Sequence, residues 1–210
     1  MFLGRGWGVS RSAFAYGEPL RGKHPAPSRS GRKLDVIFVT GGARSGKSSL
    51  AERLASEGGR PVTYIATARP GDQEMQERIA QHRQSRPGTW TTVESPSDLP
   101  RAVADALAEG GTVLVDCLTL YISNLLMSES LDVDEQARRL IDQEIDKLAE
   151  ICASANSSII IVSNEVGMGI VPDNALARAF RDVAGRANQK MAAAADNVYF
   201  CVSGIPVKVK

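Results

Sequence analysis

From Asp35 onward, the chain alternates short apolar runs rich in β-branched residues with longer segments whose apolar residues recur at helical spacing. Strands buried on both faces are apolar almost throughout, whereas helices that cover a sheet are amphipathic. The pattern predicts strands at 36–40, 62–66, 112–116, about 157–163 and 198–203, and helices at 47–57, 72–85, 97–109, 118–128, 134–155 and 174–195. The run at 89–95 is a further candidate strand, and the closing VKVK predicts an edge strand.

Strands that alternate with helices in this way are joined by right-handed crossovers. We therefore expect an α/β protein with an open, mostly parallel sheet and helices on both faces. In such a sheet, ligands bind beyond the carboxyl ends of the strands. The polar residues that follow the predicted strands are the candidates for chemistry, and they include GGARSGKS, Thr67, Asp116, Asn164 and Glu165.

The first 34 residues have a different composition from the rest of the chain. They carry seven Lys or Arg against the single Glu18, are rich in Gly, Pro and Ser, and show no periodicity. We expect a disordered basic extension at 1–34, followed by a single domain at 35–210. Three interpretations of the extension stay open: a flexible tail, upstream sequence from a wrongly assigned start codon, and a targeting peptide.

The remainder of the chain carries 18 basic and 23 acidic residues, a mildly acidic balance that gives no reason to expect nucleic acid as a partner. Cys117, Cys152 and Cys201 are odd in number and lack metal-ligand spacing, so we expect reduced core residues of a cytoplasmic protein. No apolar run reaches the roughly eighteen residues that a membrane span needs.

A phosphate-binding loop is the strongest motif. Gly41, Gly46, Lys47 and Ser48 match G-x-x-x-x-G-K-[ST] between a predicted strand and a predicted helix, which is the context the motif requires. In such a loop, backbone N–H groups surround a phosphate, Lys47 bridges the phosphates, and Ser48 is a ligand for Mg²⁺. The motif indicates the P-loop NTPase fold, in its RecA-like form.

Asp116 ends an apolar predicted strand, where P-loop proteins place a second Mg²⁺ ligand. The alternative is that it caps the following helix. The base of the nucleotide is not indicated, but the chain has no N-K-x-D motif, which argues against a switch-type GTPase.

His82 is one of two histidines, the other being His24 in the extension. Its helical spacing from Met75 and Ile79 favours a histidine packed along an amphipathic helix. However, Arg83 and Arg86 follow within about a turn, and two guanidinium groups beside a neutral imidazole can hold a phosphate while the ring attacks it. Glu94, at a predicted strand end, either binds ribose or base or is simply solvated.

Five blocks in order carry a resemblance to a known family: GGARSGKS, YIATA, the helix DQEMQERIAQHR, VDCLTLYISNLL, and the long segment that begins SNEVGMGIVP. Over roughly 36–210, the chain closely resembles the bifunctional adenosylcobinamide kinases / adenosylcobinamide-phosphate guanylyltransferases of cobalamin biosynthesis. A generic P-loop kinase would share only the first block.

The resemblance implies two reactions: phosphorylation of the aminopropanol hydroxyl of adenosylcobinamide by ATP or GTP, and transfer of GMP from GTP through a GMP-histidine to give adenosylcobinamide-GDP. It also implies a homotrimer. The implied catalytic residues are His82 and Lys47, and the implied Mg²⁺ ligands are Ser48 and Asp116. The implied nucleotide contacts are Gly41, Gly42, Ala43, Arg44, Ser45, Gly46, Lys47, Ser48, Ala66, Thr67, Ala68, Arg83, Gln84, Ser85, Arg86, Glu94 and Asp116.

Glu165 lies at the base of the glycine-containing segment NEVGMGIVPDN, which follows a predicted buried strand. It is a candidate base for the acceptor hydroxyl, and a carboxylate that caps backbone amides is the alternative. Two other functions stay open for the whole chain. One is a plain small-molecule kinase in which His82 is inert, and the other is a nucleotide-gated regulatory module without a small-molecule acceptor.

Overall fold

The computed structural model describes residues 35–71, 73–84, 86–128 and 135–210. The basic extension expected at 1–34 and the predicted nucleotide contact Ser85 lie outside the described residues.

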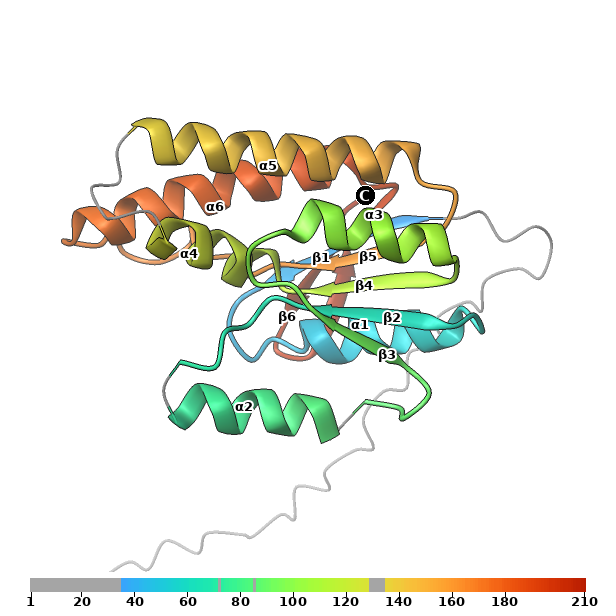
Figure 1. Ribbon diagram of the computed structural model, residues 1–210. Helices are drawn as coiled ribbons and strands as arrows, with labels where there is room; N and C mark the ends of the chain where they lie inside the picture. Colours follow the sequence, from blue (N-terminus) through green and yellow to red (C-terminus); the bar gives the residue numbers. More distant parts are fainter. Residues whose placement is uncertain (1–34, 72, 85, 129–134) are drawn as a thin grey trace, which may run out of the picture. The chain divides into compact units, whose positions relative to one another are not determined.

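Within those ranges, seven strands form one sheet in the order β3-β2-β4-β5-β1-β6-β7 (Figure 1). Every neighbouring pair is parallel except β6 and β7. The strands are β1 (Val36–Gly41), β2 (Val62–Ala66), β3 (Thr91–Glu94), β4 (Thr112–Asp116), β5 (Ser158–Val162), β6 (Asn197–Val202) and β7 (Ile205–Lys208).

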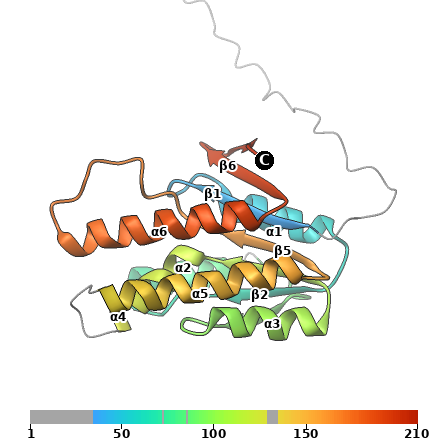
Figure 2. The same cartoon turned by 90° about the horizontal axis from the view of Figure 1, so that it is seen from above.

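Helices cover both faces of this sheet. The helices are α1 (Lys47–Glu57), α2 (Gln73–Gln84), α3 (Leu99–Glu109), α4 (Leu118–Ser128), α5 (Glu135–Ser154) and α6 (Ala175–Ala194). Figure 1 shows α1 and α2 on one side and α3 to α6 on the other, and Figure 2 shows the second group from above. The predicted α/β architecture with helices on both faces is therefore confirmed.

The two faces of the central strands bury two separate apolar clusters. Phe38, Ile65 and Ile161 belong to the cluster beneath α3, α5 and α6. Their neighbours along the strands, such as Val39 and Ile160, pack with residues of α1 on the opposite face. Because both faces are covered, the strands have almost no polar positions until their carboxyl ends.

The predicted helices and strands match the observed ones closely, and the run at 89–95 does contain a strand. The closing edge strand is the exception, because it spans Ile205–Lys208 rather than VKVK at the very end. Ser203 and Gly204 form a two-residue turn with φ of 50° and 82°, the backbone of a type I′ hairpin. Strand pairing therefore resumes directly after the turn.

All three cysteines are buried and unbridged, as expected. Burial raises the pKa of the Cys152 thiol to about 12. Among the helices of the described ranges, none has the length and apolar character that crossing a membrane requires.

Candidate active site

The register of the parallel strands sets the predicted site residues in one row. Glu94 on β3 pairs with Ala66 on β2, and Ala66 pairs with Asp116 on β4. The row continues through Val162 on β5 to Val39 on β1, two residues before the glycine loop begins. The carboxyl ends of four strands and the start of the loop therefore meet at one edge of the sheet.

The glycine loop connects β1 to α1 through backbone that only glycine adopts easily. At Gly41, φ is +148°, and a Cβ atom there would lie 2.4 Å from the carbonyl oxygen of Cys201. Gly46 caps α1 with φ of 91°. Lys47 is only 7% exposed, and its Nζ donates to the carbonyl oxygen of Gly42 at 2.6 Å, which holds the ammonium group over the loop.

The loop fits a phosphate on physical grounds. The Ser45 hydroxyl is buried and has no hydrogen-bond partner within the described part of the chain. The N-terminus of α1 adds positive potential beside it. The hairpin turn braces the loop from behind, since the amide of Gly204 donates to the carbonyl oxygen of Ser45 at 3.0 Å.

Asp116 lies half-buried at the tip of β4, and its Oδ2 accepts a hydrogen bond from the Tyr64 hydroxyl at 3.0 Å. Burial, followed by the Asp116 charge, raises the pKa of Tyr64, so this tyrosine stays a neutral donor. With the half-buried hydroxyl of Ser48, the Asp116 carboxylate offers the hard oxygen ligands that Mg²⁺ prefers. These two residues fit the ion that the sequence motif implies.

Thr67, a predicted nucleotide contact, is fully buried and its hydroxyl is engaged by protein backbone. Its Oγ1 donates to the carbonyl oxygen of Cys117 at 2.7 Å and accepts from the Cys117 amide at 2.8 Å. The Asn124 side chain donates to the Thr67 carbonyl oxygen at 2.7 Å. Thr67 thus ties the end of β2 to the start of α4.

The segment from α2 to β3 brings the predicted site residues Arg83, Arg86 and Glu94 to the same edge of the sheet. The guanidinium of Arg86 lies over the ring of Tyr64, with Cζ 3.4 Å from the ring centroid. The ring of Trp90 stacks on the ring of Tyr64, at a centroid distance of 6.5 Å. Arg83 approaches Glu94 at 3.8 Å with both side chains largely exposed.

The sequence predicted one face of α2 from Met75, Ile79 and His82. Ile79 and His82 are half-buried, and the Met75 side chain lies outside the described set.

Glu52 is a member of this site that the sequence analysis missed. Burial raises the pKa of its carboxyl above the ordinary value, the charges of His82 and Arg86 lower it, and the charge of Asp116 raises it. The Glu52 carboxyl, on the second turn of α1, is therefore within electrostatic range of His82, Arg86 and Asp116. One signal was available in the sequence, because Glu52 follows Ser48 by four residues and shares its helix face.

Tyr64 was also missed, although it precedes Ala66 by two residues and so shares its face of the sheet. The predicted residues that the structure gathers around it and the glycine loop are Lys47, Ser48, His82, Arg86 and Asp116. Gln84 is exposed, and no contact of its side chain with this group is seen among the described residues.

Glu165 follows β5 at the same edge, and its amide donates to the carbonyl oxygen of Gly41 at 2.9 Å. Its carboxylate accepts from the Gly167 amide at 2.6 Å, which is the amide-capping contact. Arg181 reaches the carbonyl oxygens of Gly167 and Ile170, and Arg178 reaches those of Pro172 and Asp173. The segment is thus fastened to α6, while a role of Glu165 as a base stays a prediction.

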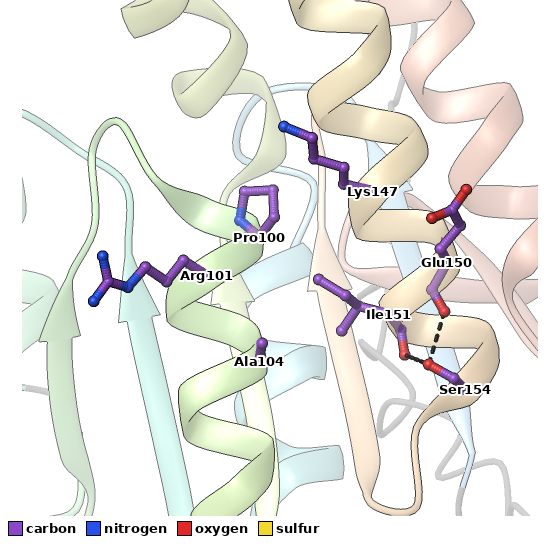
Figure 3. A pocket seen from close by; sticks show the side chains of 7 residues that line it. All are labelled: Pro100, Arg101, Ala104, Lys147, Glu150, Ile151 and Ser154. Atoms are coloured by element: carbon purple, nitrogen blue, oxygen red, sulfur yellow. Dashed lines mark hydrogen bonds between the residues drawn. The ribbon is translucent and has the colours of Figure 1, made fainter.

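An open groove of about 410 Å³ lies elsewhere, between α3 and α5 (Figure 3). The Ser154 hydroxyl at its rim bonds to the carbonyl oxygens of Glu150 and Ile151 within its own helix. No predicted site residue lines this groove, and it belongs to the face of the sheet opposite α1. It has no part in the candidate site.

A glycine loop between a strand and a helix, a strand-tip carboxylate and a mostly parallel sheet define a P-loop NTPase of RecA-like arrangement, as predicted. A solved structure described as a prototypical ATPase from the type III secretion system of pathogenic bacteria has the same fold, with a TM-score of 0.50 and 15% identity. That likeness covers 80% of this chain and 52% of the ATPase.

Residues 37–209 match the family described as cobinamide kinase / cobinamide phosphate guanyltransferase, and the chain belongs to that family. It is therefore a transferase of cobalamin biosynthesis. The bifunctional adenosylcobalamin biosynthesis protein CobU of Salmonella typhimurium is 45% identical over 181 residues, which is 83% of this chain and 99% of that protein. The bifunctional adenosylcobalamin biosynthesis protein CobP of Pseudomonas aeruginosa is 45% identical over 173 residues, 82% of this chain and 96% of that protein.

Replacing Gly41 with alanine is expected to lower the free energy of unfolding by about 1–3 kcal/mol and to weaken nucleotide binding, because the added Cβ meets the Cys201 carbonyl oxygen. Urea unfolding and titration with a fluorescent GTP analogue measure the two effects. Gly42→Ala is the matched control for stability, since a Cβ at Gly42 meets no atom within 4 Å. Equal unfolding free energies for the two variants would contradict the explanation.

Replacing Glu52 with glutamine is expected to stabilise the fold at pH 7.5 more than at pH 4. The folded-state pKa of Glu52 is raised above 4.5, so the folded state binds the proton more tightly than the unfolded chain. The free energy of unfolding of the wild type then falls as the pH rises from 4.5 through the folded-state pKa of Glu52. Above that pKa, the destabilisation by the ionised Glu52 is fully present, and glutamine removes it. Thermal unfolding at both pH values measures the difference, with exposed Glu109→Gln as the control. An equal gain at both pH values would refute the electrostatic origin.

Proposed function

We propose that this chain catalyses two successive transfers on one substrate. In the first, a nucleoside triphosphate, ATP or GTP, phosphorylates the aminopropanol hydroxyl of adenosylcobinamide. In the second, GMP from GTP passes through a covalent intermediate on His82 to the new phosphate, giving adenosylcobinamide-GDP. The family of the chain supports the two activities, and the arrangement around Tyr64 and α1 supports the assignment of residues.

In the kinase step, the hydroxyl oxygen of the acceptor attacks the γ-phosphorus and its proton is released to water. The nucleoside diphosphate leaves with the electron pair of the broken P–O bond. Phosphoryl transfer mostly requires positioning and neutralisation of charge. The loop amides from Gly41 to Ser48 and the buried ammonium of Lys47 supply donors and positive charge for the phosphates. Ser48 and Asp116 would hold Mg²⁺, which contributes further positive charge at the phosphate oxygens when it is bound.

In the guanylyl step, a ring nitrogen of His82 attacks the α-phosphorus of GTP. An N–P bond forms, the bond to the bridging oxygen breaks, and pyrophosphate leaves. A phosphate oxygen of the acceptor then attacks the same phosphorus, so that a P–O bond forms, the N–P bond breaks and His82 is regenerated. Arg83 and Arg86 supply guanidinium donors for the transferred phosphate.

One observation carries this proposal: the Arg86 guanidinium, four residues after His82, lies on the ring of Tyr64, and the hydroxyl of Tyr64 bonds to Asp116. A histidine far from the P-loop could not take up nucleotide bound at that loop. The charges of His82 and Arg86 also act on the carboxyl of Glu52, which lies on the helix that starts at the phosphate loop.

The covalent step is testable with GTP labelled at the α-phosphorus. We expect the purified protein to gain a label that is acid-labile and alkali-stable, as a phosphoramidate is, and the His82→Ala variant to gain none. His24→Ala, which removes the other histidine, is the matched control and should label like the wild type. Phosphorylation of cobinamide should persist in His82→Ala.

The outcomes separate the competing functions. Phosphorylation of cobinamide without any label on the wild-type protein would leave a plain kinase with an inert His82. Nucleotide binding with neither label nor phosphorylation would favour the regulatory module. Label that persists in His82→Ala but not in His24→Ala would show that His24, and not His82, carries the nucleotide.

We also propose a cytoplasmic homotrimer. Apolar side chains that are exposed in the single chain support subunit contacts. They lie in the segment after Glu165, along β7 and directly after it: Met168, Ile170, Val171, Ile205, Val207 and Val209. Exposed apolar groups of this kind mark interaction surfaces. Light scattering is expected to give three times the chain mass, and a stable monomer with full activity would contradict the proposal.

A further inference from the structure

Tyr64 contacts two parts of the candidate site: Asp116, beside the phosphate loop, and Arg86, in the segment that follows His82. The residue lies on β2, its side chain is only 2% exposed, and it belongs to the apolar cluster on the α1 face. Its hydroxyl bonds to Asp116 and its ring carries the guanidinium of Arg86. Asp116 belongs to the phosphate-loop group, whereas Arg86 belongs to the segment that follows His82.

The hydroxyl contact fixes the orientation of the carboxylate. An aspartate side chain rotates broadly about its last torsion, so one strong hydrogen bond decides where both oxygens point. The bond of 3.0 Å is made to Oδ2, and a carboxylate retains further lone pairs for a ligand. Partners of this kind, one step removed from a metal ligand, typically contribute about 10- to 100-fold to metal affinity.

The ring contact fixes the orientation of the guanidinium. A guanidinium that lies flat on an aromatic ring, here with Cζ 3.4 Å from the centroid, keeps its N–H groups at its edge. The Arg86 Nε is buried and makes no hydrogen bond within the described part of the chain. Trp90 supports the ring of Tyr64 at a centroid distance of 6.5 Å. Arg86 is thus held by its face, with an N–H donor still to be satisfied.

We propose that Tyr64 is a positioning residue that orients the Asp116 carboxylate through its hydroxyl and the Arg86 guanidinium through its ring. One side chain thereby orients Asp116, the metal ligand used in phosphoryl transfer, and Arg86, the cation used in guanylyl transfer. The assignment of these two roles rests on the proposed function. The two contacts are chemically separable, because phenylalanine retains the ring and loses the hydroxyl.

A second buried tyrosine provides a matched control. Tyr121 on α4 is fully buried, and its hydroxyl donates to Oε2 of Glu144 at 2.8 Å. It belongs to the cluster on the opposite face of the sheet, away from the phosphate loop. Tyr121→Phe therefore removes an equivalent bond to a carboxylate without touching the site.

The experiment compares Tyr64→Phe, Tyr64→Leu and Tyr121→Phe with the wild type in three measurements. The first is the Mg²⁺ concentration that half-saturates binding of a fluorescent, non-hydrolysable GTP analogue. The second is the initial rate of covalent labelling from α-labelled GTP at saturating Mg²⁺. The third is thermal unfolding, which reports any loss of stability in each variant.

For Tyr64→Phe, we expect the half-saturating Mg²⁺ concentration to rise about tenfold and the labelling rate to stay within about twofold of the wild type. For Tyr64→Leu, we expect the same rise in the half-saturating Mg²⁺ concentration. We also expect the labelling rate to fall about fivefold or more, because the Arg86 guanidinium loses its aromatic partner. Tyr121→Phe should change neither quantity, although it lowers the stability.

Three results would overturn the proposal: a wild-type Mg²⁺ response in Tyr64→Phe, the same Mg²⁺ shift in Tyr121→Phe, or equal labelling rates for Tyr64→Phe and Tyr64→Leu. Because Tyr64→Phe preserves the ring volume, it decides the hydroxyl contact even where the leucine variant is unstable. If the wild type gains no label at all, the guanylyl function has failed, and the Mg²⁺ measurement still judges the link from Tyr64 to Asp116.

Discussion

The in-register parallel pairing of β2, β4, β5 and β1 is the constraint on which the rest of the site depends. Since Ala66, Asp116, Val162 and Val39 share one row, each strand ends at the same level. Polar groups that are far apart in the chain then meet where the backbone leaves the sheet. A shift of one residue in β4 would turn Asp116 to the other face, because side chains alternate along a strand.

Behind this edge, a network of buried polar side chains fastens the loops to the face that carries α4 and α6. Ser163 contacts Thr119 at 3.0 Å and donates to Asn188 at 2.6 Å. The same Thr119 hydroxyl accepts from the Asn164 amide, and Asn188 donates to the Asn164 carbonyl oxygen. Because each member has a partner, the network satisfies polar backbone groups that burial would otherwise leave unpaired, and it makes the end of β5 a rigid support.

The sequence was sufficient for most of the fold, because strands buried on both faces and amphipathic helices leave clear patterns. It was also sufficient for the residues of the glycine loop and for Asp116, whose positions follow from strand ends. Tyr64 and Glu52 were not predictable in the same way. An aromatic residue within an apolar strand is normally interpreted as core, and a glutamate beside Arg53 on a helix is normally interpreted as solvated. The role of Tyr64 arises from its contact with Arg86, and that of Glu52 from the nearby charges of His82 and Arg86, whose positions no local pattern specifies.

The orientation of the segment after α2 depends more on Arg86 than on Arg83. The pair of Arg83 and Glu94 is long, at 3.8 Å, and both side chains are more than 60% exposed, so such a pair contributes between about 0 and 1 kcal/mol. Arg86 instead lies on a ring that is almost completely buried, where a desolvated cation–π contact contributes about 2 kcal/mol. The half-buried His82 precedes Arg86 by one helical turn in sequence. The buried aromatic ring therefore constrains the residues after α2 more strongly than the exposed ion pair does.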